Sequence, residues 1–372
     1  ASRWWLHHSL QALQNSLDEL GCPLLILRGA PTVVLPALAT SSGATSVFFT
    51  HAYSPAALSE EQALDEALDA AVELHGFHDY YLYEPGRLLS KTGTPYKVFT
   101  PFWKAAVALG EPARPVAAPK QVRAVAPPLL DKLQESFPSL SIDDLNLLPT
   151  HPDWASGLRE AWQPGESGAH ARLDGLADYI GQYAENRDRP DRDGTSRLSP
   201  HLHFGELSPR QVWHAMHDAS MAAGRHEGAH AFLRQIWWRD FSGHLLWHFP
   251  DLPKKPLRPG YEKFPWAEDQ DYLQAWQQGR TGYPLVDAGM RQLWATGWMH
   301  NRVRMVVASF LVKNLLIPWQ HGAEWFLDTL VDADLANNSA SWQWVAGCGT
   351  DAAPYFRVYN PVLQSRKFDP QA

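Results

Sequence analysis

The sequence has 372 residues, a length that exceeds the usual size of a single hydrophobic core and therefore predicts two domains. Its formal net charge of −8 argues against adhesion of the whole surface to nucleic acid and leaves room only for local basic patches. Two cysteines, Cys22 and Cys348, cannot form a disulfide framework, and no apolar run reaches membrane-spanning length, so we expect a cytoplasmic protein.

Residues 1–111 alternate between helical and β-rich patterns. Helical patterns cover 4–20 and 57–75, and the runs 22–29 and 46–53 are rich in residues that favour strands. This alternation predicts a Rossmann-like α/β domain with a parallel sheet, although neither a dinucleotide-binding glycine fingerprint nor a P-loop is present. Because the chain opens on a helix, we expect the first strand of the sheet to be missing.

Residues 112–165 are predicted to be a linker between two domains. Eight of the 29 prolines fall between positions 112 and 152, including Pro127 and Pro128. Such a density interrupts regular elements, so we expect this segment to run over the surface.

Residues 166–372 are predicted to form an all-α domain. Apolar spacing indicates helices over 172–186, 232–249 and 298–316, and Ser208, Pro209 and Gln211 are typical of a capped helix start. After position 319, a helical pattern is expected to give way to a Ser/Ala loop at Asn337 and Asn338.

Two of these predicted helices carry a mixed polar and aromatic face. The residues that recur at helical spacing are Gln235, Trp238, Arg239 and Ser242 on the first, and Asn301, Arg304, Met305 and Ala308 on the second. An indole, amides and guanidinium groups on one face favour a binding surface. The plain alternative for the first face is an arginine stem that covers a half-buried tryptophan.

Two further stretches are candidates for a ligand site. The turn from Thr195 to Ser199 offers hydroxyls, an arginine and free backbone N–H groups to a diphosphate, although helix capping explains its Ser and Thr equally well. The segment 319–360 combines four tryptophans with Asp328, Asp332 and Asp334. This set suits a flat, polar-edged redox ring better than a metal ion, and a Trp-rich pair of buried helices is the alternative.

Four stretches together resemble the photolyase/cryptochrome family. They are GTSRLSPHLHFGELSPRQ, WWRDFSGHLL, GRTGYPLVDAGMRQLWATGWMHNRVRMVVASFLVKNL and DADLANNSASWQWVAGCGTDAAPYFRVYNP. The likeness covers the second half in register, and the first domain resembles the family's antenna domain without its opening strand and helix. Members usually continue beyond the stretch Lys367 to Asp369, so we expect the chain to be a fragment.

The resemblance implies an FAD cofactor inside the helical domain. The residues that it would place around FAD are Tyr183, Thr195, Ser196, Arg197, Leu198, Ser199, Gln235, Arg239, Asn301, Arg304, Asp332, Asp334 and Asn338. Asn338 would face flavin N5, where plant cryptochromes carry Asp. A neutral amide cannot donate a full proton there, which fits a cofactor that works as the reduced anion.

The resemblance also implies light-driven repair of ultraviolet-damaged DNA by a monomer. Photoexcited reduced FAD would pass an electron to a cyclobutane pyrimidine dimer flipped out of the duplex, the ring would split and the electron would return. The implied catalytic residues are Gln235, Trp238, Asn301, Met305, Asn338 and Trp344. The implied DNA contacts are Arg187, Trp238, Arg302, Trp344, Arg357 and Lys367, and the implied electron relay is Trp342, Trp319 and Trp266.

Two departures from the family leave alternatives open. Gln235 stands where many dimer-repairing members have Glu, and enzymes that repair six-four photoproducts also tend to have Gln here. Animal-type six-four enzymes carry a His pair where this chain has His300 and Asn301, so that activity ranks second. A cryptochrome photoreceptor without repair is a further alternative. Thr50, His51 and Ser54 replace groups expected near a folate antenna, so a second chromophore, folate or deazaflavin, stays unassigned.

Overall fold

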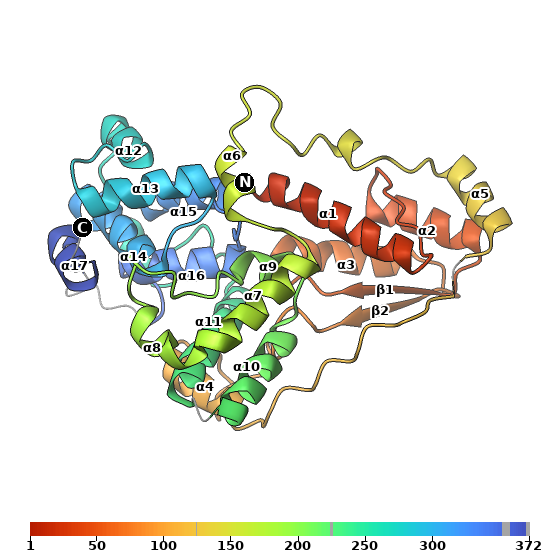
Figure 1. Ribbon diagram of the computed structural model, residues 1–372, viewed down its shortest axis with the longest axis horizontal. Helices are drawn as coiled ribbons and strands as arrows, with labels where there is room; N and C mark the ends of the chain where they lie inside the picture. The colour runs from red at the N-terminus through yellow and green to blue at the C-terminus, as the bar shows by residue number, and fades with distance from the viewer. Residues whose placement is uncertain (124, 224–225, 352–357, 370–372) are drawn as a thin grey trace.

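The computed structural model of the protein describes residues 1–123, 125–223, 226–351 and 358–369. A small sheet with its helices lies at one end of the molecule, and a larger group of helices makes up the remainder (Figure 1). We call residues 1–111 the sheet-bearing lobe and residues 166–372 the helical half. Among the described residues, no helix combines the length and the apolar character that crossing a membrane requires.

The sheet-bearing lobe has the α/β character that the sequence predicts. Strands β1 (Ser46–Thr50) and β2 (Glu73–Phe77) are parallel, and Val47 lies opposite Leu74. The helices of the lobe are α1 (Ser2–Glu19), α2 (Pro31–Ser42), α3 (Pro55–Ala67) and α4 (Phe99–Val107). Ser54 caps α3 by accepting a hydrogen bond from the Ala57 N–H at 3.2 Å, so this helix begins where a serine precedes a proline.

Two predictions for the lobe are wrong. The run 22–29 is not a strand, because Ile26 bonds only to Ser139 and Leu140 of the linker and no ladder forms. The helix predicted over 57–75 ends at Ala67 instead. Leu68 is extended, and the Asp69 carboxylate accepts from the Ala71 N–H at 2.8 Å, which turns the chain into β2.

The predicted linker contains regular structure. Its helices are α5 (Pro127–Ser136), a 3₁₀ turn η1 (Asp143–Leu145) and α6 (Ser156–Ala161). The proline pair opens α5 rather than breaking it, because the first helical position needs no N–H donor. The segment still runs over the outside of the lobe from α4 to α6 (Figure 1). The division at 112 and 165 stays a prediction.

The helical half is confirmed as all-α in its described residues. Its elements are α7 (Glu166–Tyr179), η2 (Ile180–Gln182), α8 (Tyr183–Asn186), α9 (Ser199–His203), α10 (Pro209–Ala223), α11 (His226–His248), η3 (Pro259–Lys263), α12 (Gln270–Gln277), α13 (Pro284–Thr296), α14 (Asn301–Ser309), η4 (Phe310–Asn314), α15 (Trp319–Thr329), α16 (Leu335–Ala346) and α17 (Pro361–Phe368). The predicted capping box is present. Ser208 N–H donates to Gln211 Oε1 at 2.8 Å, and Gln211 N–H donates to Ser208 Oγ at 3.2 Å.

Three predicted boundaries in this half need correction. The helix expected over 172–186 is interrupted by a 3₁₀ turn, η2. The helix expected from Trp298 begins at Asn301, because His300 acts as its N-cap, and it ends in a π-helical turn, η4. The expected Ser/Ala loop is helix α16, since Asp334 caps that helix and places Asn337 and Asn338 in its first turns.

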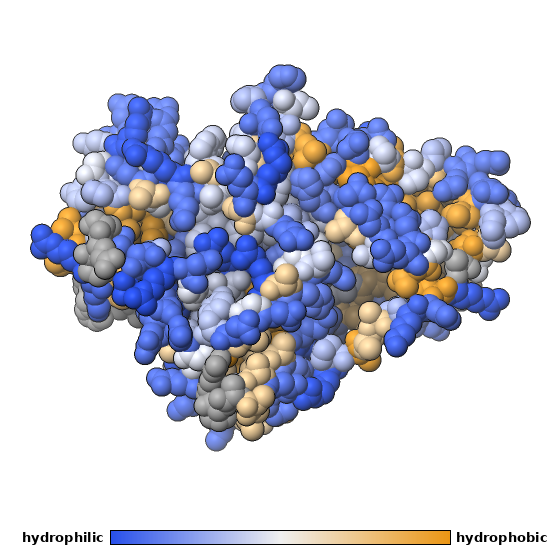
Figure 2. All heavy atoms as spheres, in the orientation of Figure 1, coloured by the Kyte–Doolittle hydropathy of each residue, from blue (hydrophilic) through white to orange (hydrophobic). Residues whose placement is uncertain are grey.

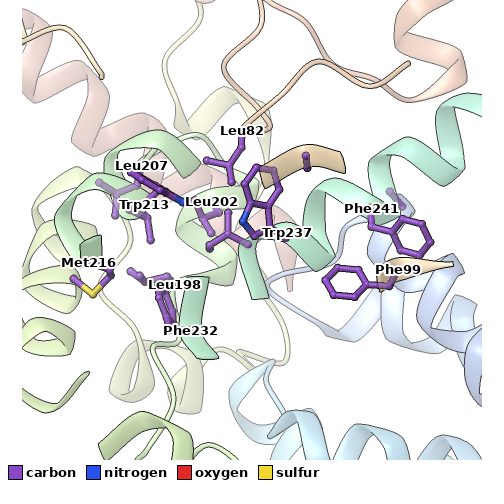
Figure 3. Close-up of a cluster of buried hydrophobic side chains, with 14 of the residues drawn as sticks. Leu82, Phe99, Leu198, Leu202, Leu207, Trp213, Met216, Phe232, Trp237 and Phe241 are labelled. Atoms are coloured by element: carbon purple, nitrogen blue, oxygen red, sulfur yellow. The ribbon is translucent and has the colours of Figure 1, made fainter. Parts of the chain in front are cut away.

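Part of the sheet-bearing lobe is buried in the core of the helical half. Leu82 and Phe99 are each 1% exposed and lie in one cluster with Trp237 and Phe241 of α11 (Figure 3). Phe102 and Ala106 of α4 belong to the same cluster. The lobe and the helical half are therefore joined by a continuous apolar core rather than by surface contacts alone.

Candidate functional site

A cavity of about 510 Å³ opens in the helical half, and most of the predicted site residues line it. The predicted residues on its wall are Tyr183, Arg187, Thr195, Ser196, Arg197, Leu198, Ser199, Gln235, Trp238, Arg239, Asn301, Arg304, Met305, Asp332, Asp334, Asn338, Trp342 and Trp344. Helices α8, α11, α14 and α16, the turn that leads into α9 and the loop that precedes α16 contribute them. The structure thus brings together residues that are up to 161 positions apart in the chain, from Tyr183 to Trp344.

The two helical faces identified by spacing both point into this cavity. All four residues of the α11 face and all four of the α14 face line it. Trp237 and Leu246 of α11 do not line the cavity, and they are 4% and 3% exposed in the apolar core. A helix with one apolar side and one mixed side therefore separates the core from the cavity.

One end of the cavity is a polar cradle around Asp332. Its Oδ2 accepts from Arg304 Nη2 at 2.9 Å and from Ser199 Oγ at 2.6 Å, while its side chain is only 4% exposed. Arg304 is also held by the Met299 carbonyl at 2.8 Å. Asp332 Oδ1 is buried without a hydrogen-bond partner among the described residues, so it is an acceptor that a bound donor could satisfy.

Asp334 fixes the neighbouring wall. Its Oδ1 accepts from the Asn337 N–H and from Asn337 Nδ2, both at 2.7 Å, and its Oδ2 accepts from the Tyr80 hydroxyl at 3.0 Å. His203 Nδ1 lies 3.3 Å from the same hydroxyl. Burial lowers the pKa of His203, and the nearby Asp334 carboxylate opposes that shift. Burial, with a further contribution from Asp334, raises the pKa of Tyr80, so this phenol keeps its proton.

The turn from Thr195 to Ser199 is held in an unusual backbone conformation. Arg197 has φ +50°, a left-handed value that is uncommon outside glycine. Its guanidinium lies 4.6 Å from the centre of the Trp298 ring and pairs with Asp193 at 3.2 Å. The Tyr179 hydroxyl donates to the Thr195 carbonyl at 3.1 Å. These contacts fix the turn so that its hydroxyl side chains line the cavity.

The aromatic and amide residues are held by specific neighbours. Trp238 stacks on Phe99 with ring centres 3.7 Å apart and planes 6° apart, so one face of this indole is covered. Gln235 Oε1 accepts from Arg187 Nη2 at 3.2 Å, and its Nε2 donates to the Ala231 carbonyl at 2.9 Å. Asn338 Nδ2 donates to the Ala323 carbonyl at 2.9 Å, which fixes that amide.

The predicted phosphate contacts lie outside the cavity or at its margin. Arg302 pairs with Asp188 at 2.7 Å, and its guanidinium lies 4.4 Å from the centre of the Phe368 ring. Arg187 reaches the same carboxylate at 3.8 Å. Lys367 Nζ lies 5.0 Å from the centre of the Phe368 ring. Arg357 lies outside the described residues.

The three predicted relay tryptophans divide between two cavities. Trp342 lines the main cavity and is 2% exposed. Trp319 and Trp266 line a second cavity of about 440 Å³, together with Lys254 and Lys255. Trp342 also packs edge-on against Phe326 at 5.0 Å and Trp276 at 6.2 Å. No described group of three or more His, Cys, Asp or Glu side chains is arranged to bind a metal ion.

The sequence did not identify several residues that help to build the site. Tyr80, His203, Trp298 and Asn337 line the cavity, and Phe99 supports Trp238 from behind. The sequence places Asn337 only at the expected Ser/Ala loop, and it does not single out Tyr80. Tyr80 and Phe99 are brought in by contacts between distant segments, so no local pattern marks them.

Known proteins are similar to this chain in sequence. Residues 1–120 match the family described as DNA photolyase, and residues 232–372 match the FAD binding domain of DNA photolyase. A deoxyribodipyrimidine photo-lyase from Agrobacterium fabrum is 46% identical over 371 residues, which is 99% of this chain and 76% of that protein. Cryptochrome-1 from Arabidopsis thaliana is 38% identical, over 99% of this chain and 54% of that protein.

A solved structure agrees with these sequence matches. The crystal structure of a bacterial class III photolyase from Agrobacterium tumefaciens superposes with a TM-score of 0.92 at 45% identity. The superposition covers 99% of this chain and 75% of that one. Both the lobe and the helical half therefore have the fold of that protein.

Proposed function

This chain belongs to the photolyase/cryptochrome family, and from that premise we propose that it splits cyclobutane pyrimidine dimers in ultraviolet-damaged DNA under blue light. It is an enzyme of the deoxyribodipyrimidine photo-lyase class, and its cofactor is FAD. The observation that carries the proposal is a single cavity that holds both a polar cradle and a cluster of indoles and amides.

The polar cradle suits the donors and acceptors of FAD. When bound, FAD supplies light absorption and the transferred electron. Ser199, Arg304 and Asp332 would hold its polar edges, and the buried, unpartnered Asp332 Oδ1 would accept one of its hydrogen bonds. Thr195, Ser196 and Arg197 would bind the diphosphate, and Tyr183, Leu198 and Arg239 would complete the wall. The donors and acceptors are held before binding, which reduces the entropy cost of ordering the site.

The indole and amide cluster would receive the flipped dimer. Trp238 and Trp344 would stack on its bases, and each stacked base contributes about 1–3 kcal/mol of binding free energy. The amides of Gln235 and Asn301 and the thioether of Met305 would contact its polar and apolar edges. The hydrogen bond from Arg187 to Gln235 Oε1 orients this amide. Because an amide does not ionise, the Gln235 side chain would be neutral beside the lesion.

Asn338 would control the proton supply at the flavin. Its side-chain amide is fixed by the Ala323 carbonyl and carries no acidic proton, so it can donate a hydrogen bond but cannot protonate a neighbour.

The electron relay between the cavity and the surface would be Trp342, Trp319 and Trp266. The residues that contact DNA phosphates would be Arg187, Arg302, Arg357 and Lys367. The two free cysteines support a reducing cytoplasm, where we propose that the protein works as a monomer.

The test is repair of an oligonucleotide that contains one cyclobutane thymine dimer. Chemically reduced protein should restore the two thymines under blue light and not in the dark. Trp238→Ala should weaken binding of the damaged strand by a factor of about 5–150, since one stacking contact is lost. Trp294→Ala is the matched control, because Trp294 is 64% exposed and stacks on Trp325 away from the cavity. Absence of repair with FAD bound would contradict the proposal.

Two other functions are favoured by particular observations. The 38% identity to cryptochrome-1 favours a photoreceptor. Such a protein would hold FAD and would repair neither the cyclobutane dimer nor the six-four photoproduct. Gln235 favours repair of six-four photoproducts, which would appear as restoration of a six-four oligonucleotide in preference to the cyclobutane one. The same assay with both substrates therefore separates the three functions.

A further inference from the structure

We propose that residues 78–83 of the sheet-bearing lobe form a latch on the FAD cavity, in which Tyr80 positions Asp334 and thereby slows the release of FAD. The proposal deepens the proposed function and rests on FAD as the cofactor, but it does not depend on DNA repair. Of the described residues in the sheet-bearing lobe, Tyr80 alone lines the cavity. The flavin site is therefore completed by a segment from outside the helical half.

Helices α10 and α11 hold the backbone of the latch at several points. Arg210 Nη2 donates to the His78 carbonyl at 2.8 Å. The two carboxylate oxygens of Asp240 accept from the Leu82 N–H at 3.2 Å and from the Tyr83 N–H at 3.1 Å. Asp240 is 4% exposed, so these two hydrogen bonds satisfy a buried carboxylate. The segment is consequently fixed to the helical half by its main chain.

Side-chain packing leaves the latch little freedom. A Cβ at Gly243 of α11 would lie 2.3 Å from the Tyr81 ring, so only glycine allows this ring to seat against the helix. Leu82 is buried beside Trp237 (Figure 3). Arg239 donates to the Tyr80 carbonyl, and its guanidinium lies 4.1 Å from the centre of the Tyr80 ring. Arg239 therefore fixes both the main chain and the ring of Tyr80 at the cavity wall.

From this position the Tyr80 hydroxyl completes the hydrogen bonding of Asp334. It donates to Asp334 Oδ2 at 3.0 Å, while Oδ1 is occupied by Asn337 at the start of α16. The Asp334 side chain is 13% exposed, so water gives it little compensation if the hydroxyl is lost. Because the pKa of Tyr80 is raised by burial, the phenol stays a donor across the neutral range. Loss of this donor would free the carboxylate to move and would loosen the wall around bound FAD.

The experiment measures FAD release in the dark from the FAD-loaded protein. Free flavin fluoresces more strongly after it leaves the protein, so its release rate can be followed after dilution. Tyr80→Phe keeps the ring against Arg239 and the backbone bonds, and removes only the hydroxyl. We expect a release rate 5- to 20-fold faster than that of the wild type. An unchanged rate would overturn the proposal.

Tyr83→Phe is the matched control. Tyr83 lies in the same latch, but its hydroxyl donates to the Gly110 carbonyl at 2.9 Å, outside the cavity. Its release rate should equal that of the wild type. If Tyr83→Phe accelerates release as much as Tyr80→Phe, the effect is general loosening and the assignment of Tyr80 is wrong.

A double-mutant cycle tests whether Tyr80 acts through Asp334. Asp334→Ser keeps an oxygen that can cap α16, but its shorter side chain does not reach the Tyr80 hydroxyl. In this background Tyr80→Phe should change the release rate by less than about 2-fold. If Tyr80→Phe accelerates FAD release by the same factor in the Asp334→Ser background, Tyr80 does not act through Asp334. That result would overturn the positioning role. The measurements need neither light nor DNA, so their failure is distinct from a failure to repair a dimer.

Discussion

The sheet of the lobe and the core of the helical half differ in how far their aromatic side chains are buried. Phe48 of β1 and Phe77 of β2 are 65% and 55% exposed, and apolar side chains gather over the lobe in Figure 2. In the helical half, Trp276, Trp319 and Trp342 are at most 2% exposed. The lobe is deeply buried in α1, where Trp4 and Trp5 are at most 1% exposed, and where the latch and α4 enter the helical core. The comparison teaches that the lobe contributes to the cavity through the latch and α4 rather than through its sheet.

Two ion pairs illustrate a second contrast. His75 and Glu73 in the lobe lie 3.2 Å apart and are both exposed, so their pair contributes little stability. The Arg304–Asp332 pair in the helical half has a carboxylate that is 4% exposed. Breaking such a pair leaves a buried charge without a partner, which is far more costly. We therefore expect the largest effects from substitutions in the helical half.

The largest effect is expected from Asp332→Ala. The substitution leaves Arg304 without its partner and removes the acceptor that would bind FAD. The free energy of unfolding should fall by about 3–5 kcal/mol, and purified protein should carry no FAD. Urea unfolding and the flavin absorbance of purified protein measure the two effects.

Asp328→Ala is the control for this prediction. Asp328 lies four residues earlier and its side chain is exposed, so stability and FAD content should stay close to the wild type. Full retention of FAD by Asp332→Ala would show that the polar cradle is not the cofactor site.

The next effect concerns His244 of α11, where the helical half meets the lobe. His244 is 2% exposed and its Nε2 lies 3.2 Å from the Tyr96 carbonyl. Burial, with a smaller contribution from His248, lowers its pKa to about 4. Between this pKa and the unfolded value of about 6.5, the unfolded chain binds more protons, so stability falls as the pH falls through this window. Between pH 7 and pH 5 the loss should be about 2 kcal/mol.

His244→Gln isolates this contribution, because glutamine can still donate to Tyr96 but does not titrate. Between pH 7 and pH 5 the free energy of unfolding should decrease in both proteins. The decrease in the variant should be smaller than that in the wild type by about 2 kcal/mol. Asp240, whose pKa is raised to about 7 by burial, changes stability in the opposite direction, but it does so in both proteins and cancels in the difference. Equal pH dependence in the two proteins would contradict the burial of a neutral His244. His170→Gln, on the exposed side of α7, should behave as the wild type.

A smaller effect is expected where α15 meets Trp342. A Cβ at Gly322 would lie 2.1 Å from the Trp342 ring, so Gly322→Ala should overpack the core and cost about 1–3 kcal/mol. At Gly175 of α7, an added Cβ would have no described atom within 4 Å. Gly175→Ala should therefore stabilise by about 0.5–1 kcal/mol through helix propensity. Thermal unfolding of both variants measures the difference, and a shift of the same sign in both would contradict the packing described here.

The sequence predicted most of the cavity because the cavity is built on helical faces. The residues of α11 and α14 follow a 3.6-residue period, so their common orientation could be inferred from spacing alone. Tyr80 and Phe99 have no such signal, because their places depend on contacts with Asp334 and Trp238 more than 130 positions away. The boundary errors have local causes. The hydrogen bond accepted by Asp69 lies where the chain leaves the predicted helix and leads into β2. Asp334 caps a helix, α16, where a loop was predicted.

The smallest effect should come from Phe99, the residue of the lobe that supports Trp238. Because Phe99 covers one face of the indole at 3.7 Å, only the other face of Trp238 is available to stack on a base. Phe99→Leu keeps most of the apolar volume but loses the flat ring that fixes the indole plane. An aromatic pair is stabilised by about 1 kcal/mol beyond burial, so the preference for dimer-containing over undamaged duplex should fall about 5-fold. The ratio of the two dissociation constants at one salt concentration measures this preference, since phosphate contacts affect both equally.

Phe102→Leu is the control, because Phe102 is 3% exposed on the same helix and packs against Phe241 at 5.2 Å. It should lower stability and leave the ratio unchanged. If both substitutions lowered the ratio equally, the lobe would act on the site through the stability of the shared core, and Phe99 would have no separate role in orienting Trp238.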